Sequence, residues 1–315
     1  MILITGSSGY LGGRIVEELS SEGRELILLR SDKPNKSPGF SEEFDSIELD
    51  LNSDISNINK IFPDSVDTVI HLASLNQASC EKNKKLAYQT NVEGTKKLLE
   101  VSKNKKIKRF INFSTCQIYG NNKLGLISED SPPNPENTYA HTHLQAENAT
   151  LEFTNFFEIV NLRISNSIGT PINQYSNCWH LFANDLCKAA IETKRIEIQS
   201  PPSVTRDFIP ISLLLEVINF FTSVSKFDSS FNKINVCSNQ KSSLLEIALL
   251  IKQRFKKIFN EEIDLISKKN ASQENEEKFS YSNLRLLDLN LKAKMEITEE
   301  IDKLLINCSK WFGNV

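Results

Sequence analysis

The chain has 315 residues, 39% of them hydrophobic, and a formal net charge of −3 at pH 7. This apolar content is enough for a large core and excludes global disorder. The small net charge excludes a strong general attraction to nucleic acid or to an anionic membrane.

Other global features narrow the class of protein. No apolar run approaches the roughly 20 residues of a membrane span, and the four histidines form no metal-ligand pattern. Six scattered cysteines without a C-x-x-C pair are typical of reduced thiols. Because the first expected strand begins at residue 2, we expect no signal peptide and a cytoplasmic protein.

The first twelve residues predict a nucleotide-binding turn. Residues 2–4 (Ile-Leu-Ile) form a short apolar strand, and Gly6, Gly9 and Gly12 follow before an amphipathic segment. Gly6 permits a turn closed to other residues, Gly9 leaves room for a pyrophosphate, and Gly12 lets the helix pack closely. The free N–H groups of the helix would face the phosphates. A glycine-rich turn without a ligand is the alternative, but the strand-turn-helix context favours a dinucleotide.

Residues at the ends of the next two expected strands would bind the adenosine half of such a cofactor. Glu25–Leu29 is the expected second strand, and Arg30 follows where an acidic residue would bind the 2′-hydroxyl of NAD. A cation there suits the 2′-phosphate of NADP, although a solvated arginine is the alternative. Ser46–Leu49 is the expected third strand. Asp50, followed by Leu51, would either meet the adenine amino group or cap the next segment.

Further strands and helices complete the first half. Ala73 and Ser74 are small residues at a strand end, where a cofactor would lie across the sheet. The polar Asn91, in the middle of a helix, would either form a hydrogen bond across the core or hold a water molecule near the site. Five strands that alternate with helices in the first 115 residues predict a doubly wound parallel sheet. The segments concerned are a strand over 67–73, a helix over 84–102 and a strand over 108–115.

Candidate catalytic residues lie at the end of the fifth strand and in the helix that follows it. Ser114 and Thr115 stand at its carboxyl end, where such sheets keep their reactive groups. A helix is expected to begin near residue 138, and Tyr139 and His143 share one face of it because they are four residues apart. His141, two residues from Tyr139, faces away.

Beyond a sixth strand over 158–164 the alternation of elements loosens. We expect a dinucleotide-binding domain of residues 1–165, with 203–238 returning to it, and a smaller C-terminal α+β substrate lobe of 166–202 and 239–315. Within this half we expect helices over 179–193 and 213–224 and strands over 195–199, 207–211 and 231–237. The most polar stretch, 268–279, is expected to be a surface loop.

Together these motifs resemble the extended short-chain dehydrogenase/reductase family, especially its NAD(P)-dependent nucleotide-sugar epimerases, dehydratases and reductases. The resemblance covers nearly the whole chain and implies a Rossmann sheet with a smaller substrate lobe. It rests on Thr-Gly-Ser-Ser-Gly-Tyr-Leu-Gly (5–12), His-Leu-Ala (71–73), Asn-Val-Glu-Gly-Thr (91–95), Ser-Thr-Cys-Gln-Ile-Tyr-Gly (114–120), Leu-Arg-Ile-Ser-Asn-Ser-Ile-Gly (162–169), Arg-Asp-Phe-Ile-Pro-Ile (206–211), Asn-Val-Cys-Ser (235–238) and Ser-Leu-Leu-Glu (243–246).

The resemblance also implies roles for single residues. Tyr139 falls on the catalytic acid/base, and Thr115 on the hydroxyl residue that orients the sugar oxygen. Arg206 would clamp the sugar-nucleotide diphosphate in a bidentate way. Cofactor binding is implied for Gly6, Ser8, Gly9, Tyr10, Leu11, Gly12, Arg30, Asp50, Leu51, Leu72, Ala73, Asn91, Tyr139 and His143. Substrate binding is implied for Ser74, Thr115, Asn166 and Arg206.

One departure from the family pattern concerns the base. The family has Tyr-x-x-x-Lys, but His143 takes the place of the lysine here. A cation ~5 Å from a phenol lowers its pKa by about two units, or about 3 kcal/mol at an effective dielectric of ~20. A histidine with the ordinary pKa of ~6.5 would carry that charge about a quarter of the time at pH 7. We therefore expect catalysis with His143 to be weakened, pH-dependent or lost.

A second departure concerns the type of reaction. Sugar 4,6-dehydratases of this family carry an Asp-Glu pair where this chain has Cys116 and Gln117. Since neither residue replaces a carboxylate in moving protons, a dehydratase is disfavoured.

The sequence thus predicts an epimerase or reductase that acts on a nucleotide-activated sugar and prefers NADP, with NAD as the alternative. Two other hypotheses stay open: a reductase of a non-sugar ketone, and a catalytically weakened NADP(H)-binding sensor or partner subunit. A homodimer through the helices over 84–102 and 138–156 is also expected, although their apolar residues equally suit the core.

Overall fold

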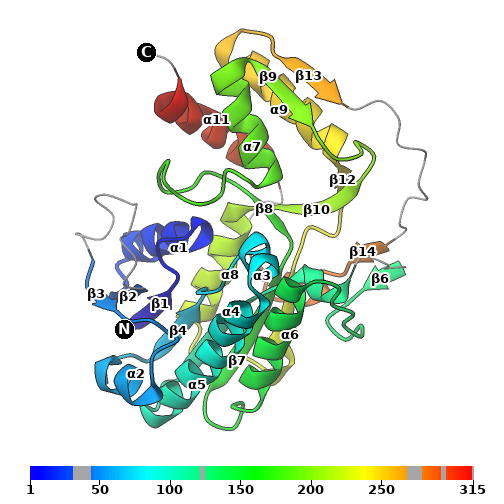
Figure 1. Ribbon diagram of the computed structural model, residues 1–315. Helices are drawn as coiled ribbons and strands as arrows, with labels where there is room; N and C mark the ends of the chain where they lie inside the picture. The colour runs from blue at the N-terminus through cyan, green and yellow to red at the C-terminus, as the bar shows by residue number, and fades with distance from the viewer. Residues whose placement is uncertain (31–43, 121–124, 268–278, 292–295, 314–315) are drawn as a thin grey trace. The chain divides into compact units, whose positions relative to one another are not determined.

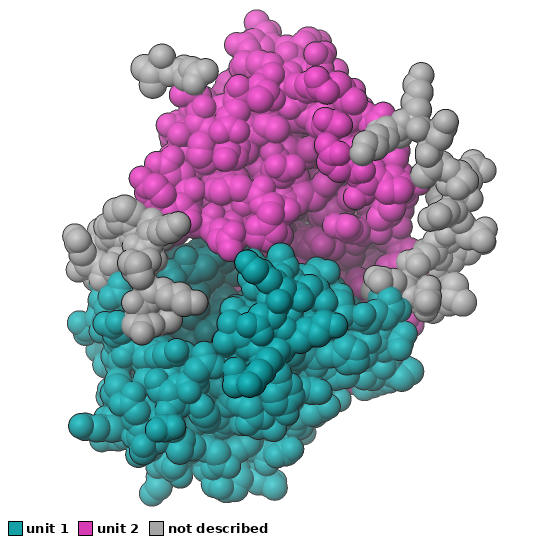
Figure 2. Space-filling view, viewed as in Figure 1, with its two compact units in different colours: residues 1–121, 129–164, 218–235 teal, residues 122–128, 165–217, 236–315 magenta. Residues whose placement is uncertain are grey.

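The computed structural model describes residues 1–30, 44–120, 125–267, 279–291 and 296–313. It divides into two compact units, which Figure 2 colours separately. Unit 1 comprises residues 1–121, 129–164 and 218–235, and unit 2 comprises residues 122–128, 165–217 and 236–315. Most of the predicted polar loop, 268–278, lies outside the described residues.

Unit 1 is built on a seven-stranded sheet of order β11-β7-β5-β4-β1-β2-β3. The paired strands from β7 to β3 run parallel, and all of them except the partly exposed edge strand β3 are short and mostly buried, as a parallel sheet predicts. The doubly wound Rossmann sheet predicted from the sequence is therefore confirmed (Figure 1). Its strands are β1 (Ile2–Thr5), β2 (Leu26–Arg30), β3 (Ser46–Glu48), β4 (Thr68–His71), β5 (Arg109–Thr115), β7 (Glu158–Ile164) and β11 (Lys233–Val236).

Helices flank this sheet (Figure 1), and buried apolar residues of the helices pack against it. Leu98, Leu99 and Val101 pack into one cluster with Leu3 and Phe110 of the sheet. The helical elements of unit 1 are α1 (Tyr10–Ser21), α2 (Ile55–Ile61), α3 (Gln77–Lys82), α4 (Lys84–Tyr88), the π-helical turn η1 (Gln89–Glu93), α5 (Gly94–Asn104), the 3-10 turn η2 (Cys116–Tyr119), α6 (Thr138–Leu151) and the 3-10 turn η3 (Ser229–Asn232).

The predicted continuous helix over 84–102 differs from the structure in its middle. A π-helical turn separates α4 from α5 and carries Asn91. Such a turn widens the backbone, and here it accompanies an asparagine that is 2% exposed and fully engaged in hydrogen bonds. Sequence periodicity does not reveal where an α-helix widens into a single π-helical turn.

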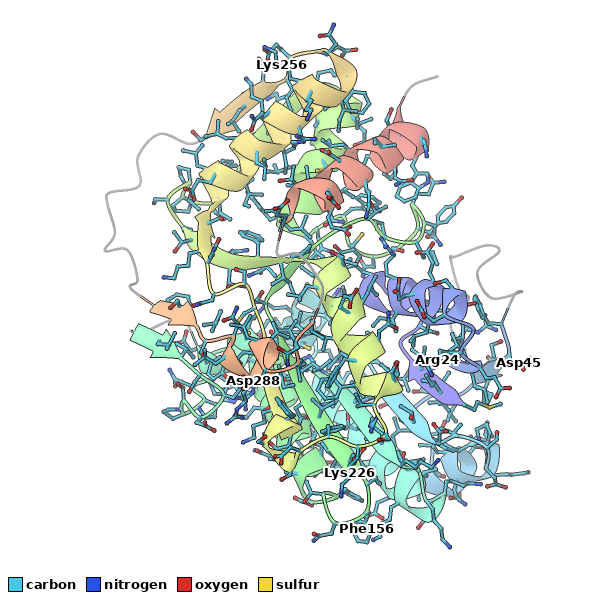
Figure 3. All side chains as sticks on the ribbon, turned by 180° about the vertical axis from the view of Figure 1, so that it is seen from behind. Arg24, Asp45, Phe156, Lys226, Lys256 and Asp288 are labelled. Atoms are coloured by element: carbon cyan, nitrogen blue, oxygen red, sulfur yellow. The ribbon has the colours of Figure 1, made fainter. Side chains whose placement is uncertain are left out.

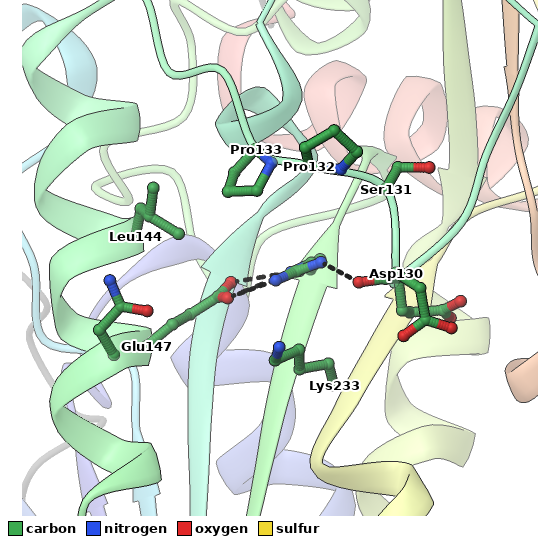
Figure 4. Close-up of a pocket in the computed structure, with 10 residues that line it drawn as sticks. Asp130, Ser131, Pro132, Pro133, Leu144, Glu147 and Lys233 are labelled. Atoms are coloured by element: carbon green, nitrogen blue, oxygen red, sulfur yellow. Dashed lines mark hydrogen bonds and ion pairs between the residues drawn. The ribbon is translucent and has the colours of Figure 1, made fainter.

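A buried ion pair joins α6 to the sheet. Arg163 of β7 donates from Nε and Nη2 to the Glu147 carboxylate at 2.7–3.2 Å, and both side chains are 3% exposed or less. Arg163 Nη1 also donates to the hydroxyl of Tyr119 at 2.7 Å, and that hydroxyl donates to Asn235 Oδ1 at 2.7 Å. The pair borders a cavity of about 320 Å³ under the Pro132–Pro133 turn (Figure 4).

The described residues of unit 2 form three small sheets and several helices. Its core contains apolar residues of α7, α9 and α11. Helix α9 begins at the Ser-Leu-Leu-Glu motif (243–246) with a capping box, in which Ser243 and Glu246 satisfy each other's backbone N–H groups. The sheets are β12-β10-β8, β13-β9 and β14-β6. The elements are β6 (Gly125–Ile127), β8 (Asn166–Ile168), α7 (Phe182–Thr193), β9 (Arg195–Ile198), β10 (Thr205–Pro210), β12 (Lys241–Ser243), α9 (Leu244–Phe259), β13 (Asp264–Ser267), β14 (Phe279–Tyr281), α10 (Leu284–Leu287) and α11 (Thr298–Phe312).

The segment that returns to unit 1 is shorter than the 203–238 expected from the sequence. Only residues 218–235 belong to unit 1, so the boundary falls within α8 (Ile211–Ser223). The reason is that β10 pairs with β8 and β12 inside unit 2.

Replacement of Glu147 by alanine is expected to lower the free energy of unfolding by about 3–5 kcal/mol, because the Arg163 guanidinium would stay buried without its partner. Urea denaturation would measure the loss. Glu152→Ala, at an exposed glutamate just beyond α6, is the control and should change stability by less than about 0.5 kcal/mol. Equal effects of the two substitutions would contradict a stabilising role of the pair.

Candidate functional site

The glycine turn after β1 can accept only glycine at two positions. Gly6 has φ of +68°, and a Cβ there would lie 2.8 Å from the backbone nitrogen of Ala73. A Cβ on Gly12 would lie 2.2 Å from the carbonyl oxygen of Gly6. The turn therefore packs directly against the end of β4 and the start of α1.

The start of α1 is open to an anion. Gly9 is its N-cap residue and makes no side-chain cap, and the first turn of the helix holds no acidic residue. Ser8 lies in the turn, Tyr10 and Leu11 open the helix, and the buried hydroxyl of Ser7 has no hydrogen-bond partner among the described residues. Uncapped N–H groups, the helix dipole and an unsatisfied hydroxyl fit a bound phosphate.

At the end of β2, Arg30 keeps its positive charge available. Its Nη2 donates to Ser46 Oγ at 2.8 Å. Its buried Nε has no hydrogen-bond partner among the described residues, and no described carboxylate forms an ion pair with the guanidinium. Asp50 instead accepts the backbone and side-chain N–H groups of Asn52 at 2.9 Å, within its own turn. Leu51, beside it, is buried. The structure thus contains the local capping contact of Asp50, and its contact with the adenine amino group stays a prediction.

A chain of hydrogen bonds with defined direction connects β1, β4 and α5. The Thr95 hydroxyl donates to the carbonyl of Asn91 at 2.7 Å, so it accepts from Nε2–H of His71 at 2.8 Å. Nδ1 of His71 is then the acceptor for the Thr5 hydroxyl at 2.7 Å, and Thr5 Oγ1 accepts the backbone N–H groups of residues 72 and 73. The network assigns one neutral tautomer to His71.

Asn91 extends this network to α6. Its Oδ1 accepts the backbone N–H of Leu75 at 2.8 Å, and its Nδ2 donates to Thr142 Oγ1 at 3.0 Å. The expected hydrogen bonding of Asn91 across the core is confirmed. Sequence reasoning missed Thr5, Thr95 and Thr142, although threonines next to apolar strand and helix positions were a usable signal.

The candidate catalytic residues stand where β5 meets the start of α6. Asn137 caps α6 by accepting the N–H of Ala140, and its Nδ2 donates to Gln117 Oε1 at 3.2 Å. Gln117 in turn donates its backbone N–H to Thr115 Oγ1 at 3.1 Å. Since α6 packs against β5 and η2, the first turn with Tyr139 and the strand end with Thr115 belong to one region.

Tyr139 and His143 share a face of α6, as their spacing predicts. Their ring centroids are 4.3 Å apart in an edge-on arrangement, whereas His141 is exposed. His143 also lines a small cavity of about 10 Å³ beside the β4 end. Other predicted site residues that border this cavity are Leu72, Ala73, Ser74 and Asn91.

Burial changes the protonation of this region. It lowers the pKa of His143 to about 4, against a hydrogen bond with the Phe113 backbone that acts in the opposite direction. Burial, and then the neighbouring His143, lower the pKa of His71 to about 3. Burial, with a smaller effect of Cys80, raises the pKa of Tyr139 to about 12. The expectation that His143 is charged a quarter of the time at pH 7 is therefore wrong, because desolvation keeps the imidazole neutral.

The predicted diphosphate-binding residues lie in unit 2. Asn166 of β8 pairs with Phe208 of β10, two residues beyond Arg206, so Asn166 and Arg206 stand on adjacent strands. Asn166 Nδ2 donates to the backbone carbonyl of Asp207 at 2.9 Å. The buried Asp207 carboxylate, missed from the sequence, accepts from Ser165 and Ser238 and so holds this strand end in place.

Two negative findings apply to the described part of the chain. No helix there is long and apolar enough to cross a membrane. Nor do three or more histidine, cysteine or carboxylate side chains of those residues come together as a metal site.

Residues 2–237 match the model of the NAD dependent epimerase/dehydratase family. The chain is 27% identical over 303 residues to ADP-L-glycero-D-manno-heptose-6-epimerase of Brachyspira hyodysenteriae. This alignment covers 91% of this chain and 90% of that protein. It is 30% identical over 182 residues to UDP-glucose 4-epimerase of Haemophilus influenzae, covering 53% of each chain.

Solved structures share the fold. MoeE5 in complex with UDP-glucuronic acid and NAD superposes with a TM-score of 0.80 at 22% identity, covering 98% of this chain and 99% of that one. UDP-glucose 4-epimerase of Thermus thermophilus in complex with NAD gives a TM-score of 0.78 at 19% identity, covering 98% of both chains.

The two buried histidines are expected to destabilise the protein in acid. Below pH ~6.5 they bind protons in the unfolded state, but the folded state resists protonation until the pH approaches about 4 for His143 and about 3 for His71. Stability should therefore fall with decreasing pH by roughly 1 kcal/mol per pH unit for each histidine. Urea denaturation between pH 6.5 and 4.5 would show a smaller slope for His143→Gln than for the wild type. His141→Gln, on the exposed side of α6, should leave the slope unchanged, and an unchanged slope in His143→Gln would contradict the assignment.

Proposed function

The chain belongs to the NAD dependent epimerase/dehydratase family, and we propose that it is an NADP-preferring epimerase or reductase acting on a nucleotide-activated sugar. The observation that carries this proposal is the open glycine turn at α1 in the same unit as the Thr115–Tyr139 region. Curated relatives such as UDP-glucose 4-epimerase support a sugar nucleotide as the substrate class.

Residues of the chain take separate roles in this proposal. The glycine turn and the N-terminus of α1 hold the pyrophosphate, and the Thr115 hydroxyl orients the sugar oxygen that reacts. Tyr139 moves the proton on that oxygen. The nicotinamide cofactor, when bound, supplies or accepts the hydride. Asn166 and Arg206 bind the diphosphate of the substrate, where the planar guanidinium suits phosphate oxygens.

His143 binds the cofactor as an acceptor in this proposal. Its Nε2 is buried and has no partner among the residues described, and the ring is 5% exposed. A neutral imidazole whose free nitrogen has a lone pair accepts a hydrogen bond from a hydroxyl group, here one of the nicotinamide ribose.

We propose a homodimer through α4–α5 and α6. These helices expose less apolar surface for a dimer interface than their sequences implied. Phe153 is 6% exposed and belongs to the core, whereas Phe156 is 54% exposed, with Lys103 Nζ 4.3 Å from its ring centre (Figure 3). A monomeric mass in analytical ultracentrifugation at micromolar concentration would contradict the dimer.

Cofactor preference is tested by fluorescence titration with NADPH and NADH. Arg30→Ala should weaken NADPH binding about 10- to 100-fold, the magnitude of a charge-assisted hydrogen bond, and should leave NADH binding nearly unchanged. Arg24→Ala is a matched control, because Arg24 precedes the opposite end of β2 and is exposed (Figure 3). Equal affinity of the wild type for both nucleotides would contradict the NADP preference, and binding of neither would contradict the function itself.

The second candidate function is a catalytically weakened NADP(H)-binding protein, which the neutral state of His143 favours. A screen of UDP- and dTDP-linked 4-keto sugars with NADPH separates the two. We expect turnover that Tyr139→Phe reduces about 10²- to 10⁴-fold, with NADPH affinity changed less than threefold. Unchanged turnover in this variant would exclude Tyr139 as the acid/base, and binding of NADPH without any turnover would favour the weakened protein.

A further inference from the structure

Three buried oxygen atoms of unit 2 have no hydrogen-bond partner among the described residues. They are Oε2 of Glu300 in the first turn of α11, Oδ1 of Asn184 in α7, and Oγ of Ser176 in the segment between β8 and α7. Their residues are 1%, 0% and 2% exposed, respectively. Since a buried polar atom without a partner costs free energy, these atoms point to a ligand that they could share.

The side chains of Glu300 and Asn184 both border Gly169. A Cβ on Gly169 would lie 2.9 Å from Glu300 Oε2, so the glycine lets the carboxylate approach the backbone. Asn184 Nδ2 donates to the carbonyl oxygen of Gly169 at 3.3 Å and lies 3.6 Å from Cys178 Sγ. Because the amide nitrogen must face that carbonyl, Oδ1 is the atom left over, and it can only accept. Ser176 belongs to the same segment, two residues before Cys178.

The charge of Glu300 is balanced on one side only. Its Oε1 lies 3.6 Å from Nζ of Lys303, one turn further along α11, and that lysine side chain is 54% exposed. An ammonium group in water is screened and contributes little to such a pair. Oε2 lies in the interior beside Gly169 and Ile211, where an unbalanced negative charge is costly.

We propose that these three oxygens bind a monovalent metal cation, Na⁺ or K⁺, which joins the segment after β8 to the start of α11. Carboxylate, amide and hydroxyl oxygens are the ligands that hard cations prefer. The single carboxylate supplies the one negative charge that a monovalent ion requires, whereas Ca²⁺ loops combine several carboxylates. The ion balances the charge at Oε2, which a water molecule in the same place would not do.

The ion would hold a segment that the proposed function also uses. Asn166, which is proposed to bind the diphosphate of the substrate, stands three residues before Gly169 in β8. The ion site itself requires neither cofactor nor substrate. It can therefore be tested on the protein alone, and it can fail without affecting the proposed function.

The two tryptophans of the chain lie in the two elements that the ion would join. Trp179 belongs to the segment after β8 and Trp311 to α11, and their ring centroids are 6.1 Å apart. Their emission can be followed in the full-length protein while KCl, or NaCl, replaces choline chloride at constant ionic strength. We expect a saturable change in emission with half-saturation at millimolar concentration. A linear response, or none, with both salts would overturn the proposal.

Matched variants locate the ion. Glu300→Gln keeps the shape of the side chain and removes its charge, so it should fold but lose the saturable change in emission. Glu299→Gln removes the charge of the exposed neighbour and should respond like the wild type. Asn184→Ala removes one ligand and should raise the half-saturating concentration about tenfold, the magnitude of one lost polar contact. A wild-type response in Glu300→Gln, or an unchanged half-saturation in Asn184→Ala, would contradict the proposed ligands.

Thermal unfolding provides a second measurement that does not rely on fluorescence. Because the ion binds only the folded state, the Tm of the wild type should rise by about 3 °C once the cation exceeds its dissociation constant tenfold. Glu299→Gln should show the same rise and Glu300→Gln none. Equal Tm values of the wild type in choline, sodium and potassium chloride would overturn the proposal and indicate that water fills the site.

Discussion

The candidate site depends on a chain of hydrogen bonds between neutral groups that runs from Thr5 to Thr142. It connects the strand before the glycine turn, through His71, Thr95 and Asn91, to the helix that carries Tyr139. Every step has a defined donor and acceptor, so a proton added to His71 would break it. The buried region that positions the site therefore exists only while its histidines stay neutral.

The ion pair of Arg163 and Glu147 serves the same helix by different means. Its two charges are buried together, and the remaining guanidinium N–H groups are occupied by Tyr119 and by the carbonyl of Glu129. One end of α6 is thus held by charge and its first turns by neutral hydrogen bonds. The pair joins α6 to β7, and neither of its charges is among the causes that shift the pKa of Tyr139.

Much of the fold could be predicted because its signals are local. Buried parallel strands read as short apolar runs, and the strands of unit 1 that were expected from residues 25–29, 46–49, 67–73, 108–115 and 158–164 are present with ends shifted by at most two residues. The short strands β6, β12, β13 and β14 were not predicted. Most of their residues are partly or fully exposed, and partners remote in the sequence define them, as when Gly125–Ile127 pairs with Phe279–Tyr281.

The sequence by itself determined the glycine turn, the alternation of buried strands with helices and the presence of a Tyr-x-x-x-His pair on one helical face, since each follows from residue type and spacing. Only the tertiary structure decided the protonation of that pair. The pKa of His143 depends on burial by β4, β5 and η1, segments that lie far from it in the chain, and no local pattern reports desolvation. The same holds for Asp50, whose Oδ1 accepts two hydrogen bonds from Asn52 within its own turn. Position in the sequence identified the candidate residues, and the surrounding dielectric and hydrogen bonds determined their protonation.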